Sequence, residues 1–136
     1  VVRLVGMSFA VCFVILALIF SNYGYTALAF AGIAILLVVS CTFDPRMWMS
    51  SHTLLFFLLS YLPFLLANGA LTALPIVNYS STAILGVRVY TIPLEDFFYN
   101  FGMLGFYLFF FRLAERVLGR TPRSTRYRVK GRHDES

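Results

Sequence analysis

Two adjacent acidic residues, Glu95 and Asp96, stand at the start of a long apolar segment. Ionisable side chains are costly within a membrane span, so their default interpretation is functional. A water-poor site favours the protonated form of a carboxyl group, which can then act as a proton donor. The alternative is structural, because acids in a first helical turn complement the helix dipole and Arg88 could pair with one of them. Position alone leaves both interpretations open.

The neighbours of the two acids favour the functional interpretation. On a helix, Glu95 would share a face with Tyr99. Asp96 would share the next face with Asn100. Since adjacent helical residues diverge by about 100°, the two acids cannot both point at the same atom. We therefore expect one acid to meet a substrate and the other to orient it or pair with Arg88.

The composition excludes a soluble domain. Of 136 residues, 60% are hydrophobic and 12% are charged, and the mean hydropathy is +0.80. Soluble domains are closer to half apolar and one-quarter charged. The first 43 residues contain Arg3 as their one charged side chain. The length suits one compact bundle, so we expect an integral membrane protein with a single all-α domain.

Four apolar segments are long enough to cross the hydrocarbon core as helices, at residues 2–20, 25–43, 53–74 and 93–118. Pro63 lies inside the third and should kink it. Residues 75–92 are too polar to span and too apolar for a free loop, so we expect them to pack against the bundle. The prediction is a polytopic transmembrane helix bundle over residues 1–118. A basic tail at 119–136 is expected to be disordered.

The basic residues predict the orientation. With four spans, Arg3, Arg46 and the basic cluster at residues 112–132 fall on one side, and Arg88 falls on the other. The positive-inside rule then places both termini in the cytoplasm, with the bundle in the cytoplasmic membrane. The tail could also contact anionic lipid. No nucleic-acid-binding signature accompanies the basic residues, so nucleic acid is not expected as a partner.

Several chemistries lack their usual residues. No glycine-rich nucleotide loop follows a strand, and no aspartate-rich cluster is present to hold magnesium. His52 and His133 are far apart, without cysteine or carboxylate at metal-ligand spacing. Cys12 and Cys41 lie in apolar segments and are expected to act as small hydrophobic residues. We therefore expect neither a metal nor a cofactor.

An ordered series of motifs resembles a known family. The series comprises Tyr61-Leu-Pro-Phe-Leu-Leu-Ala-Asn68 continuing to Asn78-Tyr79, then Ile84-Leu-Gly-Val-Arg88, then Ile92-Pro-Leu-Glu-Asp-Phe-Phe-Tyr-Asn-Phe101. It resembles the membrane lycopene cyclase domain of the heterodimeric or tandem-repeat type. The likeness is greatest to the second half of that pair, whose proline-any-acid-acid motif reads Glu-Asp. The resemblance covers roughly residues 51–111. One departure is Tyr90, where this family is expected to have glycine.

The resemblance implies a carotenoid cyclase, or one essential half of it. The reaction is redox-neutral: a proton adds to a terminal alkene, the chain closes on the cation, and a neighbouring proton leaves. Glu95 and Asp96 are then the catalytic candidates, with Glu95 favoured as the proton donor because it shares a helix face with Tyr99 and Gly102. Aromatic rings could stabilise the cation. The candidate substrate-binding residues are Asn68, Tyr79, Arg88, Pro93, Phe97, Phe98, Tyr99 and Asn100. The implied partners are a hydrophobic carotene, membrane lipid, and a homologous first half or a second copy of the chain.

Two other functions remain open at this point. The chain could be a non-catalytic membrane subunit in which the two acids and Arg88 form an ion pair that holds a partner. It could also be a small transporter or channel with the acids as a cation site. The second is the weaker alternative, because the sequence has neither an inverted repeat nor a second buried charge.

Overall fold

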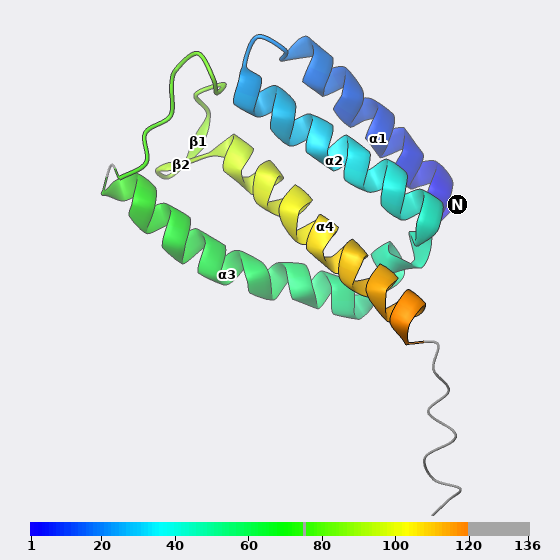
Figure 1. Cartoon of the computed structure of the whole chain (residues 1–136). Helices are drawn as coiled ribbons and strands as arrows, with labels where there is room; N and C mark the ends of the chain where they lie inside the picture. Colours follow the sequence, from blue (N-terminus) through cyan, green and yellow to red (C-terminus); the bar gives the residue numbers. More distant parts are fainter. Residues whose placement is uncertain (75, 120–136) are drawn as a thin grey trace, which may run out of the picture.

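The computed structural model describes residues 1–74 and 76–119 as a bundle of long helices. Its elements, labelled in Figure 1, are α1 (Val2–Ile19), α2 (Gly24–Phe43), the short 3-10 helix η1 (Pro45–Met49), α3 (Ser51–Ala73), β1 (Arg88–Val89), β2 (Ile92–Pro93) and α4 (Leu94–Leu118). The helices end within two residues of the predicted spans. Apart from Gly119, the predicted tail lies outside the described residues.

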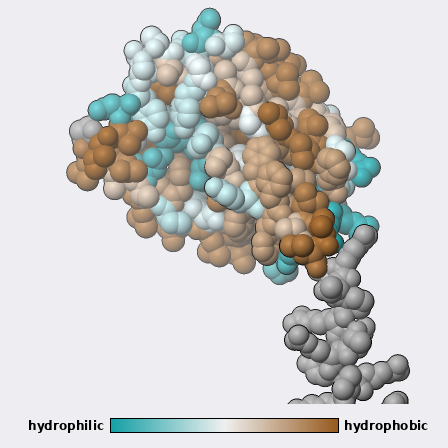
Figure 2. Space-filling view, in the orientation of Figure 1, coloured by the Kyte–Doolittle hydropathy of each residue, from teal (hydrophilic) through white to brown (hydrophobic). Residues whose placement is uncertain are grey.

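Within the described chain, α1, α2, α3 and α4 are each long and apolar enough to cross a membrane. This confirms the prediction of a polytopic all-α membrane protein. Apolar side chains cover much of the molecular face seen in Figure 2, as expected for a surface that meets lipid tails. In such a protein, leucines exposed on the surface contact lipid tails and do not indicate a protein partner.

Helix α2 is the centre of the bundle and packs against both α1 and α4. Its residues Ile33 and Leu36 are fully buried, and Leu36 joins Phe109 of α4 in one apolar cluster. A Cβ atom at Gly105 would collide with the side chain of Leu36. The small residue therefore permits the close approach of α2 and α4, as is common between membrane helices.

Helix α3 stands further from the others and contacts the bundle mainly through α4, η1 and β2. The helix continues unbroken through Pro63. It curves along its length in Figure 1. Most of its leucines are exposed. The looser packing of α3 leaves room for cavities along α4.

The connection from α3 to α4 closes over one end of the bundle, as the sequence predicted. Strands β1 and β2 pair in antiparallel register, with Arg88 opposite Pro93. The backbone amides of Tyr25 and Thr26 both donate to the carbonyl of Ala83. This connection is thereby fixed to the first turn of α2.

The turn between β1 and β2 holds Tyr90 with a φ of +60°. This left-handed conformation is uncommon for residues other than glycine. It accounts for the expectation of glycine at this position. The Tyr90 side chain is 90% exposed, so nothing packed around it offsets the backbone cost.

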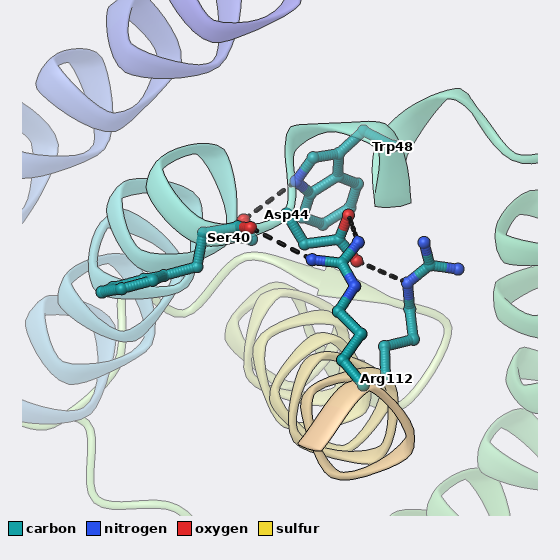
Figure 3. Close-up of polar contacts among 6 residues, drawn as sticks. Ser40, Asp44, Trp48 and Arg112 are labelled. Atoms are coloured by element: carbon teal, nitrogen blue, oxygen red, sulfur yellow. Dashed lines mark hydrogen bonds and ion pairs between the residues drawn. The ribbon is translucent and has the colours of Figure 1, made fainter. Parts of the chain in front are cut away.

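The opposite end of the bundle is held by charges (Figure 3). Asp44, 3% exposed, accepts a hydrogen bond from Nε of Arg112 at 2.6 Å and another from Arg116. Nearby, the indole of Trp48 donates to Ser40 at 2.9 Å. Burial acts to raise the pKa of Asp44, but its hydrogen bonds and charge attraction to the two arginines outweigh this and hold the pKa below its ordinary value. These contacts tie the last turns of α4 to the end of α2.

Candidate active site

Glu95 and Asp96 lie in the first turn of α4, the helix that begins directly after Pro93. Proline is well suited to a helix start, because its fixed φ matches the helix and its missing amide hydrogen is not needed there. Both acids are almost completely buried, at 2% and 3% exposure. A buried carboxyl group needs hydrogen-bond partners, and these come from other elements.

Asp96 receives hydrogen bonds on both carboxylate oxygens. Its Oδ1 accepts from the hydroxyl of Tyr25 at 2.8 Å. Its Oδ2 accepts from the amide of Asn68 at 2.7 Å and from the hydroxyl of Tyr79 at 2.6 Å. These donors belong to α2, α3 and the connection before α4, so Asp96 joins three separate parts of the chain.

Glu95 points to different partners. Its Oε1 accepts from the hydroxyl of Thr26 at 2.8 Å and from the backbone amide of Leu85 at 2.6 Å. Its Oε2 is buried and has no hydrogen-bond partner within the described residues. The two acids thus diverge, as their adjacent positions on a helix require. Glu95 fastens the connection to α2.

Asp96 lines a cavity of about 360 Å³, called here the acidic cavity, between α2, α3 and α4. Its other polar lining residues are Tyr25, Asn68, Tyr79, Tyr99 and Asn100. Burial and the hydrogen bond to Asp96 raise the pKa of Tyr79 above its ordinary value, so Tyr79 keeps its proton and donates at neutral pH. Glu95 does not line this cavity.

Three tyrosine rings line the acidic cavity with Asp96, and two of them, Tyr25 and Tyr79, bond to its carboxyl group through their hydroxyls. The ring centroid of Tyr25 lies 5.8 Å from that of Tyr79 and 5.8 Å from that of Tyr99. The faces of such rings carry negative potential and attract cations. The acidic cavity therefore combines a carboxyl group with aromatic faces suited to a developing positive charge.

Arg88 does not pair with either acid, and that expectation was wrong. Its side chain is exposed and donates to the backbone carbonyl of Thr91 at 2.8 Å. Both ion pairs of the described residues involve Asp44 instead. The physical reason is local: the hairpin carries Arg88 on its exposed strand β1, where the side chain bonds to the backbone of the same hairpin.

The predicted substrate-binding residues divide between two places. Asn68, Tyr79, Tyr99 and Asn100 gather with Asp96 at the acidic cavity. Phe97 and Phe98 instead line a second, apolar cavity of about 560 Å³. Pro93, buried in strand β2 of the hairpin, lines neither cavity. The helical periodicity of α4 separates these residues, because consecutive side chains leave in different directions.

The sequence did not predict the roles of Tyr25 and Thr26 of α2. Their hydroxyls donate hydrogen bonds to Asp96 and Glu95, respectively. They lie about 70 residues before the acids, as the separations of 71 and 69 show. A signal was present, since two adjacent hydroxyl-bearing residues open an otherwise apolar span. Polar residues within a span usually seek partners inside the bundle. The backbone amide of Leu85 could not have been recognised this way.

Comparison with known proteins gives one match. No curated protein and no solved structure matches the chain. The model of the family described as lycopene cyclase matches residues 22–114. That range includes both acids and the five residues described above as donating hydrogen bonds to them. Because the match spans more than half of the 136 residues, this membrane protein belongs to the lycopene cyclase family, whose place is in carotenoid biosynthesis.

Proposed function

We propose that this chain cyclises the acyclic end group of a lycopene-type carotene, alone or as one essential half of the enzyme. The observation that carries the proposal is the environment of Asp96. This buried carboxyl group lines a cavity together with three tyrosines, and its hydrogen-bond donors among the described residues are all neutral. A proton donor for an alkene must lie at a cavity that admits the end group, and Asp96 lines such a cavity.

The reaction conserves both atoms and oxidation state. Protonated Asp96 adds its proton to one carbon of the terminal double bond and leaves a cation on the other. A nearby double bond of the chain attacks that cation and forms the ring carbon–carbon bond. The cation thus moves into the ring, and a proton leaves an adjacent carbon to form the ring double bond. One proton enters and one leaves, and no electron acceptor is required.

The neighbours of Asp96 have definite roles in this scheme. After proton donation, Asp96 carries a negative charge, and Tyr25, Asn68 and Tyr79 are placed to donate hydrogen bonds to it. Hydrogen bonds to an ionised acceptor are stronger than those to a neutral one. The donors therefore help more as the proton departs, which is the condition for catalysis. Asp96 is the acidic residue of this cavity among the described residues, so we assign the returning proton to the same carboxylate.

We propose Asp96 as the proton donor rather than Glu95. The sequence favoured Glu95 because Tyr99 was expected on its face, but Tyr99 lines the acidic cavity with Asp96. Glu95 is bound to the backbone of the connection and to α2, away from that cavity. Its proposed role is to position the connection that carries Tyr79.

Partner and orientation are also proposals. The resemblance to the second half of a two-part cyclase supports a requirement for a homologous first half. Arg3, Arg112 and Arg116 lie at the same end of the bundle, where they contact Thr42, Asp44 and Phe43. By the positive-inside rule, this end, with both termini, is cytoplasmic. The acidic cavity then lies toward the opposite side of the membrane.

The test is pigment analysis in a lycopene-accumulating host, with and without a homologous first half. The wild-type chain should yield cyclic carotene when the first half is present. Asp96→Asn keeps size and most hydrogen bonds but removes the transferable proton, so product should fall by about 10²–10⁴-fold at matched protein levels. The control is Glu115→Gln, which removes an exposed acid from the same helix.

Near wild-type product from Asp96→Asn would reject the proposed donor. If the wild-type chain makes no cyclic product with any first half, the non-catalytic subunit becomes the better interpretation. In that case the acids serve only to join α2, α3 and the connection.

A further inference from the structure

The apolar cavity differs in kind from the acidic cavity. It is called here the aromatic groove and has a volume of about 560 Å³. Its lining contains no charged side chain among the described residues. Seven of its lining residues carry aromatic rings: Phe9, Phe13, Trp48, Tyr61, Phe97, Phe98 and Phe101. Helices α1, α2, α3, α4 and η1 all contribute to it, and exposed lining residues such as Val5 and Phe9 show that it opens at the surface of the bundle.

The aromatic groove leads toward the acidic cavity. Along α1 it is lined from Val2 to Phe13, about 16 Å at 1.5 Å per residue. At its inner end it reaches Phe97, the residue that follows Asp96. A polyene chain lying in the groove would therefore have one end at the first turn of α4, where the side chains of Phe97 and Asp96 leave in different directions.

A thin aromatic wall separates the two cavities. Tyr61 and Phe97 line the groove, whereas Phe64 lines the acidic cavity. The ring of Phe64 lies 5.5 Å from that of Tyr61 and 5.4 Å from that of Phe97. The hydroxyl of Tyr61 donates to the carbonyl of Phe97 at 2.8 Å and fixes the wall to α4. One layer of side chains thus divides an apolar space from an acidic one.

A second groove of about 550 Å³ provides an internal comparison. It lies on α1 and α2 and is lined by small and aliphatic residues, among them Ala17, Leu28 and Ala31, with no aromatic ring among its described lining residues. It shares no residue with the acidic cavity. Saturated lipid tails suit such a surface, whereas stacked rings favour a flat conjugated chain.

From these observations we infer that the aromatic groove binds the conjugated chain of the carotene while the reacting end group crosses the Tyr61–Phe64–Phe97 wall into the acidic cavity. This inference rests on the proposed cyclase function. On this inference substrate recognition has two parts. The acidic cavity acts on the end group, and the aromatic groove determines which lengths of conjugated chain bind. Residues at the outer part of the groove, such as Val5, then affect long substrates more than short ones.

The binding test uses Trp48, the single tryptophan of the chain, which lines the groove. The full chain in nanodiscs of saturated phosphatidylcholine is titrated with lycopene while the fluorescence of Trp48 is recorded. Val5→Phe narrows the groove, and Leu28→Phe adds a ring to the second groove as the matched control. Overpacking at a binding surface should weaken the quenching affinity of Val5→Phe by about tenfold. Leu28→Phe should retain wild-type affinity.

The activity test compares lycopene with a shorter acyclic polyene that has the same end group, in the presence of the first half. Val5→Phe should lower turnover of lycopene by about tenfold and leave the shorter substrate within about twofold of wild type. Equal quenching and equal turnover for Val5→Phe and Leu28→Phe would overturn the inference and leave lipid as the occupant. Groove-dependent quenching without any cyclic product from the wild-type chain would instead reject the proposed function.

Discussion

The two ends of the bundle each bury an aspartate of similar exposure, Asp44 and Asp96. Asp44 is held by two arginines from α4, whereas Asp96 is held by two tyrosines and an asparagine. Guanidinium groups keep a carboxylate ionised and resist its protonation. Asp96 has neutral hydrogen-bond donors and no cation among its partners in the described residues.

The elements around Asp44 and Asp96 also differ between the two ends. The Asp44 cluster joins α2 to α4 and includes the bond from Trp48 to Ser40 beside it. The Asp96 network opens onto a cavity of about 360 Å³. The comparison indicates that the Asp44 end stabilises the bundle and that the Asp96 end is a site for chemistry. Each prediction below changes one end and measures whether stability or turnover responds.

The largest effect on stability is expected from Asp44→Asn. The substitution removes the negative charge that two arginines share, but both arginines are partly exposed and can turn to water. We therefore expect a loss of about 2 kcal/mol in the free energy of unfolding. Unfolding in detergent measures it, and carotene turnover per folded protein should stay within a few-fold. A loss of turnover as severe as that of Asp96→Asn at equal stability would contradict the division between the two ends.

Acid should reproduce the effect of Asp44→Asn without mutation. Because the pKa of Asp44 is lowered in the folded protein, its ion pairs stabilise fully at neutral pH. This contribution is lost as the pH falls below about 4, toward the folded pKa. Thermal unfolding of wild type and Asp44→Asn between pH 7 and pH 3 measures the difference. The two proteins should differ at pH 7 and converge at the acid end; a constant difference would show that the ion pairs do not carry the stability.

At the acidic end, Tyr25→Phe should act mainly on turnover. It removes one of the three hydrogen bonds to Asp96 and keeps the ring next to Tyr79. One hydrogen bond contributes about 1 kcal/mol, so we expect a fall in turnover of about fivefold. Tyr107→Phe, at an exposed position of α4, is the control. If Tyr25→Phe changed only the amount of folded protein, Tyr25 would be structural rather than a positioning residue.

The smallest effect is expected at the hairpin beside the acidic end. Tyr90→Gly relieves a left-handed backbone conformation and should stabilise the protein by about 0.5–1 kcal/mol. Val89→Gly, in the adjacent strand, has no such strain to relieve and should destabilise by a similar amount. The comparison is between their unfolding midpoints. Equal destabilisation by both would mean that Tyr90 gains contacts that outweigh its strain.

The sequence determined the membrane class and the helices of this protein. Apolar segments of about 20 residues are a local property, and each becomes a helix wherever it lies in the bilayer, because its backbone must satisfy its own hydrogen bonds. The motif around Glu95 and Asp96 likewise identified the family and the acids. The divergence of the two acids also followed from the sequence, since it depends only on the geometry of one helix.

Only the tertiary structure decided what the acids meet. Tyr25 and Thr26 reach Asp96 and Glu95 across about 70 residues, and Asp44 reaches its arginines across a similar distance. Arg88 lies close in sequence but contacts neither acid. Hydropathy and periodicity describe one segment at a time, whereas these pairings depend on how the helices pack and on where the hairpin turns. That packing places Asp96, and not Glu95, on the cavity.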